Sequence, residues 1–207
     1  MRSCKIELKI VAGIIGILIA IPLIAVVVIA NAGVSEIASA LASVNPITHL
    51  VSIFNANGKQ VAQISVSTVW PVAGQITLEF GQPDPPYQEH HTGIDIANPH
   101  RHIGDSITTF MTGKVVTVNS SPNNPTGYGE YVAIDHGNKI TSLYGHMSET
   151  KVFVGQQVKP GDIIGLEGET GHATGPHVHF EIRVYGIPVN PRVFMVGDPA
   201  LGPTLWT

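Results

Sequence analysis

Residues 177–184 read HVHFEIRV, a stretch in which polar and apolar side chains alternate without a break. Alternation with a period of two predicts a β-strand, because successive side chains of an extended chain point to opposite faces. The apolar side chains share the face that packs on a core, and they are Val178, Phe180, Ile182 and Val184. The polar side chains share the other face, and they are His177, His179, Glu181 and Arg183. Two imidazoles therefore project side by side from a face that the core does not occupy.

Similar short runs, rich in alternating or β-branched residues, continue from Trp70 onward and are separated by Gly, Pro, Asn and Asp. They are 76–80, 93–97, 114–118, 131–135, 139–144, 163–166 and 177–184. Strands at such short intervals are typical of an antiparallel sandwich or barrel. We therefore expect an all-β domain over residues 70–195, followed by a C-terminal tail over 196–207.

Composition limits the classes of function. The 207 residues include 11 Lys+Arg and 15 Asp+Glu, which gives a net charge of -4 and argues against a nucleic-acid partner. The single cysteine excludes a disulfide framework and a cysteine-based zinc cluster. Histidine, with 10 residues, is well represented. Histidine chemistry is therefore the first candidate for the function.

Residues 10–30 form an uncharged apolar run of 21 residues, long enough as a helix to cross a hydrocarbon core of about 30 Å. Arg2, Lys5 and Lys9 precede it, and the next cation is Lys59. The positive-inside rule then predicts a single-pass protein with a cytoplasmic tip at 1–9 and the rest extracytoplasmic. The alternative is a signal peptide cleaved near Ala32, but the run exceeds the ~7–15 residues of a signal core, which favours the anchor.

Residues 31–69 are expected to form a stalk that is partly helical. Residues 35–44 predict a short helix, and the apolar stretch 47–54 suggests a second one. The segment lifts the main domain off the membrane in this interpretation. It could also pack on the domain or cover its cleft, and the sequence leaves these alternatives open.

A second polar cluster lies in residues 91–95, HTGID. His91 and Asp95 share a face of extended chain and flank Gly93, which leaves a gap between them. With one histidine from strand 177–184 they make three ligands, and zinc held by three protein ligands keeps a fourth position for water, as catalytic sites do. The other histidine of that strand stays free for acid–base work.

Several motifs in order resemble the lysostaphin-like, LytM-type zinc metalloendopeptidases of bacterial peptidoglycan, over residues 70–191. They are HTGIDIA (91–97), TGKVVTV (112–118), GEYVAIDHGN (129–138), SLYGHMS (142–148), VGQQVKPGDIIGLEGETGHATGPHVHFEIR (154–183) and VNP (189–191). The resemblance implies a β-fold of the duplicated hybrid motif type. It also implies that His91, Asp95 and His179 ligate Zn2+. His146 and His177 would be the uncoordinated catalytic histidines, with their separate roles unassigned.

The function implied by the resemblance is that of a membrane-anchored zinc endopeptidase. Its partners would be peptidoglycan peptides, cleaved in the stem or the cross-bridge, and the membrane. The peptide would lie in a groove bounded by loops 82–88 and 120–127. The main alternative is a non-catalytic wall-binding or activator protein of the same fold. Residues 154–166 also resemble the turn of biotinyl and lipoyl carrier domains, but no lysine stands in the context that a carrier requires.

The remaining histidines are assigned to structural or surface positions. His100 and His102 form a second H-x-H in an exposed loop, and His136 lies in a hairpin turn. The others are His49, His90 and His172, and His172 lies in a turn that could reach the rim of the cleft. Tyr87 precedes His91, so its hydroxyl could reach a developing oxyanion, although packing is the more common role for such a residue.

Overall fold

The structure is a computed structural model that describes residues 34–65, 69–100, 102–123, 126–197 and 199–201. It divides into two compact units, Met1–Ile37 and Ala38–Thr207. The first helix of the described residues is α2 (Val34–Leu41). The described residues are mostly β-structure and every strand pairing is antiparallel, so the all-β prediction is confirmed.

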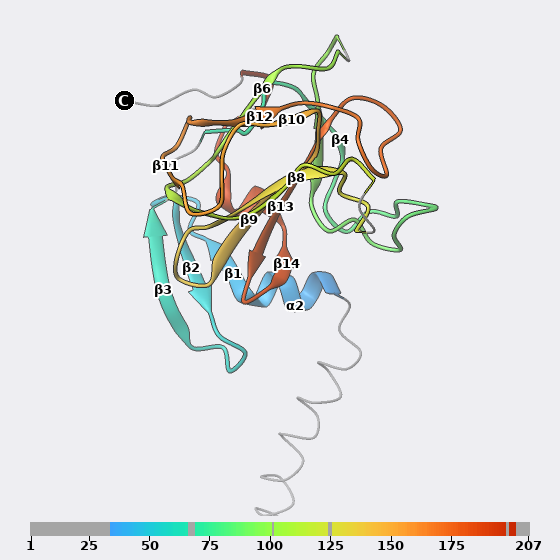
Figure 1. Cartoon of the computed structure of the whole chain (residues 1–207). Helices are drawn as coiled ribbons and strands as arrows, with labels where there is room; N and C mark the ends of the chain where they lie inside the picture. Colours follow the sequence, from blue (N-terminus) through green and yellow to red (C-terminus); the bar gives the residue numbers. More distant parts are fainter. Residues whose placement is uncertain (1–33, 66–68, 101, 124–125, 198, 202–207) are drawn as a thin grey trace, which may run out of the picture. The chain divides into compact units, whose positions relative to one another are not determined.

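An eight-stranded sheet, which includes the strands β8, β9 and β13 of Figure 1, contains Asp95, His146 and His179. Its strand order is β11-β7-β8-β9-β13-β5-β4, with β14 paired to β13. The bounds are β4 (Gln75–Leu78), β5 (Ile94–Ala97), β7 (Gly113–Asn119), β8 (Glu130–Asp135), β9 (Ile140–Met147), β11 (Gln157–Val158), β13 (Val178–Val184) and β14 (Ile187–Val189).

Strand β13 lies between β9 and β5, and its register places His179 opposite Gly145 of β9 and Asp95 of β5. Phe180 and its apolar neighbours on the strand are fully buried, as the alternation predicts. The polar face is buried too: His179 is 2% exposed and Glu181 0%. That face is the floor of a cleft rather than a solvated surface, and its polar atoms bond to one another.

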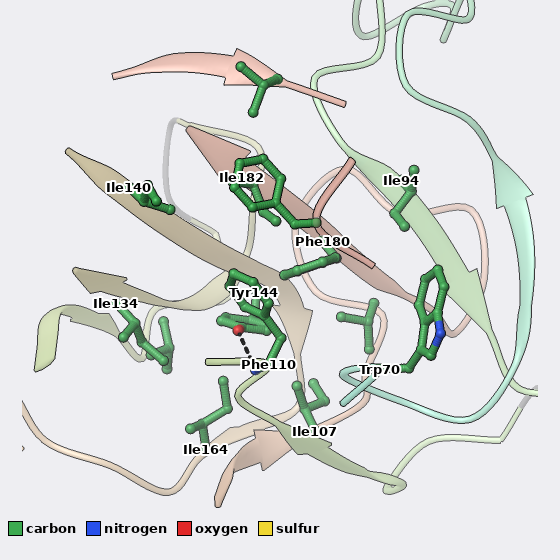
Figure 2. Close-up of a cluster of buried hydrophobic side chains, with 14 of the residues drawn as sticks. Trp70, Ile94, Ile107, Phe110, Ile134, Ile140, Tyr144, Ile164, Phe180 and Ile182 are labelled. Carbon is green, nitrogen blue, oxygen red and sulfur yellow. Dashed lines mark hydrogen bonds between the residues drawn. The ribbon is translucent and has the colours of Figure 1, made fainter. Parts of the chain in front are cut away.

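A three-stranded sheet of order β10-β12-β6 contributes to the same core. Its strands are β6 (Ser106–Thr108), β10 (Glu149–Thr150) and β12 (Ile163–Leu166). Figure 2 shows Ile107 of β6 and Ile164 of β12 in one cluster with Phe180 of β13. In the same cluster the backbone N–H of Phe110 donates to the Tyr144 hydroxyl at 3.2 Å. Burial of apolar side chains from both sheets is the main stabilising contribution.

Each of the seven strands expected after Trp70 is present, and no end is shifted by more than three residues. The strands that the sequence did not reveal, β6, β10, β11 and β14, are two or three residues long. Runs this short carry no measurable alternation. Two 3₁₀ helices, Pro191–Phe194 and Pro199–Leu201, complete the described chain.

The segment expected to be a stalk contains a three-stranded antiparallel sheet of order β1-β2-β3. The prediction of a helix over 47–54 was wrong. Leu50–Phe54 is strand β2, which pairs with β1 (Ala42–Val44) and β3 (Gln60–Ser65). Val51 and Ile53 are 0% exposed and belong to the same buried cluster as the main domain. Burial of alternate β-branched side chains therefore favours a strand over a helix in this stretch. The sequence left open whether this segment is a stalk, packs on the domain or covers its cleft. The three-stranded sheet packs on the domain core.

Within the described residues, no helix has the length and hydropathy needed to cross a bilayer. The apolar run 10–30, which carries the anchor prediction, lies outside the described residues.

Candidate functional site

A cleft of about 340 Å³ opens over the polar face of β13 and β5. Its floor carries every residue that the sequence assigned to metal or catalysis: His91, Asp95, His146, His177 and His179. Loops contribute its walls, through Asp84, Tyr87, Gln88, Thr126, Gly127, Tyr128, His172 and Thr174. Both loops expected to bound the groove, 82–88 and 120–127, therefore do so.

Three donor atoms from different parts of the chain converge at the floor of this cleft. Oδ1 of Asp95 lies 3.0 Å from Nε2 of His91 and 3.0 Å from Nδ1 of His179, and the two nitrogens are 3.0 Å apart. The register between β5 and β13 brings Asp95 beside His179, and His91 approaches from the residues before β5. Gly93 permits this approach, since a Cβ there would lie 2.4 Å from the Phe180 carbonyl oxygen.

The donor set fits a zinc ion. Ligand atoms of tetrahedral zinc, with bonds of about 2.0–2.1 Å, are about 3.3 Å apart, close to the spacing found here. Burial alone would raise the pKa of Asp95, but hydrogen bonds with His179 and His91 hold it far below its usual range. The carboxylate is therefore anionic, as a metal ligand must be. The side facing the cleft holds no fourth protein donor among the described residues.

His146 and His177 stand beside this set with ring centroids 4.6 Å apart. Nδ1 of His146 is 2.7 Å from the carbonyl oxygen of Thr170, and Nδ1 of His177 is 2.8 Å from that of Gly175. A carbonyl oxygen only accepts, so each Nδ1 carries the hydrogen and each neutral ring keeps its lone pair on Nε2. The Nε2 of His177 lies 3.6 Å from Oδ2 of Asp95.

The environment of His146 favours the neutral ring. Burial, followed by the nearby His177 and His179, lowers the pKa of His146 to about 3. Its backbone also has φ of 60°, in the left-handed region that non-glycine residues rarely adopt. Such strain collects at functional sites, where the surrounding structure maintains it. Here the His146 N–H donates to the Tyr128 carbonyl at 2.7 Å.

Tyr128 and Glu181 were not assigned a function from the sequence. The Tyr128 hydroxyl donates to Oε2 of Glu181 at 3.1 Å, and the same oxygen is 3.4 Å from Nε2 of His179. The strand alternation could have identified Glu181, because it lies two residues from His179 on one face. Tyr128 carries no comparable signal, since only the fold brings its loop over β13.

Tyr87 and His172 stack across the cleft wall, with ring centroids 4.7 Å apart and an interplanar angle of 16°. His172 thus lines the rim, the less favoured of the two positions that the sequence allowed. His100 and His102 do not line the cleft, and His102 instead pairs with Asp105 at 2.9 Å. His136 directly follows β8, at the turn that leads into β9, as predicted.

Comparisons with known proteins agree with this geometry. Residues 89–191 match the family model of peptidase family M23. The peptidoglycan DD-endopeptidase ShyA of Vibrio cholerae is 44% identical over 100 residues, which are 48% of this chain and 22% of that protein. This chain therefore matches less than a quarter of that relative's length.

Two solved structures are also similar. One is the catalytic domain, in a mutant form, of the prophage-encoded M23 protein EnpA from Enterococcus faecalis. It is 37% identical with a TM-score of 0.50, and the match covers 59% of this chain and 90% of that one. The other is a zinc-containing peptidase from Vibrio cholerae, 30% identical with a TM-score of 0.55, covering 72% of this chain and 47% of that one. The chain belongs to peptidase family M23.

Proposed function

We propose that this protein is a membrane-anchored zinc metalloendopeptidase that hydrolyses peptide bonds in the stem or cross-bridge peptides of bacterial peptidoglycan. The observation that carries the proposal is the convergence of Asp95 Oδ1, His91 Nε2 and His179 Nδ1, all 3.0 Å from one another, beneath an open cleft. The similar zinc-containing peptidase from Vibrio cholerae supports the choice of metal.

The chain's own residues divide the work in this proposal. His91, Asp95 and His179 hold the zinc ion. The ion would supply a water of lowered pKa and polarise the scissile carbonyl. His146 and His177 present Nε2 lone pairs toward the cleft, so they accept a proton from the attacking water and return it to the leaving amine. While one of the two rings holds that proton, the pair also stabilises the negative charge on the oxygen of the former carbonyl group.

The substrate assignment rests on the shape of the cleft and on the relatives. The floor is formed by strands and the walls by loops 82–88 and 126–128, which leaves a groove for an extended peptide. ShyA is named a peptidoglycan DD-endopeptidase. We therefore assign this protein a bond in a peptidoglycan peptide.

The location is part of the same proposal. Residues 10–30 anchor the protein as a single helix with residues 1–9 in the cytoplasm, and the peptidase domain faces outward. Protease treatment of intact cells should remove the domain and leave an N-terminal fragment in the membrane. A mature protein whose first residue lies near Ala32 would instead establish the cleaved-signal alternative.

Digestion of purified peptidoglycan by the detergent-solubilised full chain tests the activity. Mass spectrometry of the muropeptides should show new termini at one type of peptide bond with the wild type, and none with His146→Ala. A wild-type protein that binds zinc and sediments with peptidoglycan, yet releases nothing, would contradict the enzyme proposal and favour a wall-binding or activator protein.

A further inference from the structure

Glu181 is a fully buried carboxylate, two residues from His179 on the same face of β13. Burying a charge costs free energy unless other groups compensate it, so its partners indicate what it does. Three side chains surround it: His179, Tyr128 and Arg183.

The two oxygens of this carboxylate have different partners. Oε1 accepts a hydrogen bond from Nε of Arg183. Oε2 accepts from the Tyr128 hydroxyl at 3.1 Å and faces Nε2 of His179 at 3.4 Å. Arg183 also donates to the Tyr128 hydroxyl, from Nη2 at 3.1 Å. Arginine and tyrosine together therefore fix the carboxylate, and one oxygen remains directed at the imidazole.

Both ring nitrogens of His179 face a carboxylate oxygen: Nδ1 lies 3.0 Å from Oδ1 of Asp95, and Nε2 lies 3.4 Å from Oε2 of Glu181. Nδ1 is also 3.0 Å from His91 Nε2, so it is the atom that belongs to the three converging donors. An imidazole that gives its Nδ1 lone pair to a metal ion carries its hydrogen on Nε2, where Glu181 can accept it. The Tyr128 ring packs against the same imidazole with centroids 5.5 Å apart.

We propose that Glu181 is a positioning residue, which holds His179 in the tautomer and orientation that bind the metal, and that Tyr128 and Arg183 keep Glu181 in place. The inference rests on the proposed zinc function. A carboxylate that accepts a hydrogen bond from a histidine ligand makes the imidazole a stronger electron-pair donor to the metal. Removing such a carboxylate typically weakens metal binding by about 10–100-fold.

Zinc titration of the full-length protein against a competing chelator tests the proposal. Glu181→Gln keeps an acceptor but loses the charge, and zinc should bind about tenfold more weakly. Glu181→Leu loses both, and the loss should approach about 100-fold. Tyr128→Phe removes one hydroxyl and should give a smaller loss in the same direction. The control is Glu169→Gln, a nearby exposed carboxylate, and its zinc affinity should equal the wild type's.

A purely structural role predicts a different result. It lowers the unfolding temperature measured in excess chelator and leaves zinc affinity within about twofold of the wild type's, and this outcome would overturn the proposal. If the Glu181 variants fail to fold, Tyr128→Phe decides by the same criterion. Nitrogen-15 NMR of the zinc-loaded wild type gives a second readout: His179 should carry its hydrogen on Nε2, and a hydrogen on Nδ1 would overturn the proposal.

Zinc affinity is measured without peptidoglycan, so the inference and the proposed activity fail separately. A protein that cleaves peptidoglycan but binds zinc equally well with Glu181→Gln refutes the inference alone. A protein whose zinc affinity depends on Glu181 but that cleaves nothing refutes the enzyme proposal alone.

Discussion

Thr170 holds His146 through its backbone: the His146 Nδ1–H donates to the Thr170 carbonyl oxygen over 2.7 Å. The Thr170 side chain is itself tied to two strands. Its hydroxyl donates to the Met147 carbonyl at 2.7 Å and accepts from the Glu130 N–H at 2.9 Å. The orientation of a proposed catalytic imidazole therefore depends on a loop residue that does not line the cleft.

Replacing Thr170 with valine should lower turnover while zinc binding stays intact. Valine keeps the shape but leaves the Glu130 N–H and Met147 carbonyl without this partner, which costs about 1–3 kcal/mol of unfolding free energy. The loop then holds His146 less firmly, and a misplaced catalytic group can cost about 10²-fold in rate. We expect kcat to fall by about tenfold or more, measured on a peptidoglycan peptide alongside a zinc titration.

Thr150→Val is the matched control, because the Thr150 hydroxyl bonds that of Ser120 near the surface, at 2.9 Å. Its unfolding free energy and kcat should stay close to the wild type's. Equal kcat for Thr170→Val and Thr150→Val would show that the loop does not position His146.

Mutations should distinguish the metal ligands from the proton-transfer residues. His146→Ala and His177→Ala each leave the three converging donors in place, so one zinc ion per chain should remain while hydrolysis falls by about 10²–10⁴-fold. Asp95→Ala removes an anionic donor shared by two histidines, and the protein should be purified without zinc. Metal analysis and muropeptide release are the measurements. Zinc loss in His177→Ala with zinc kept in His179→Ala would reverse the roles of these two histidines.

Gly93→Ala should damage the site through the backbone. The new Cβ would lie 2.4 Å from the Phe180 carbonyl oxygen and 3.0 Å from Cε1 of His179, so β5 and β13 must separate at the point where the donors meet. Overpacking of this kind costs about 1–3 kcal/mol. We expect a lower unfolding temperature together with weaker zinc binding. An unchanged zinc affinity would show that the strands can adjust without moving His179.

The sequence predicted the parts of the site that strand alternation can encode. The period of two in residues 177–184 placed His179 on one face, and the H-x-x-x-D spacing placed His91 beside Asp95. Convergence of these two segments depends on the pairing of β5 with β13, which no local pattern shows. Here the family resemblance supplied the ligand set, and with it the choice of His179 over His177.

The parts that could not be predicted depend on tertiary contacts. Tyr128 reaches Glu181 only because the fold places its ring against His179 of β13. The local sequence around Val51 and Ile53 is also compatible with a short helix. Leu50–Phe54 forms a strand because these two side chains are buried in the core of the domain. Local propensity is a weak guide wherever burial decides the conformation.

His136 should make stability depend on pH away from the metal site. Burial lowers the pKa of His136 to about 4, despite a hydrogen bond to the Thr112 carbonyl at 2.9 Å, and the ring packs edge-on against Phe110. Above pH ~6.5 the residue is neutral in both the folded and the unfolded chain, so its contribution is complete. Between pH ~6.5 and 4 only the unfolded chain takes up the proton, and stability falls by at most about 3 kcal/mol.

Urea unfolding from pH ~7.5 to ~4.5 should therefore give a shallower pH dependence for His136→Asn than for the wild type. Identical slopes in the two proteins would mean that His136 does not titrate on unfolding.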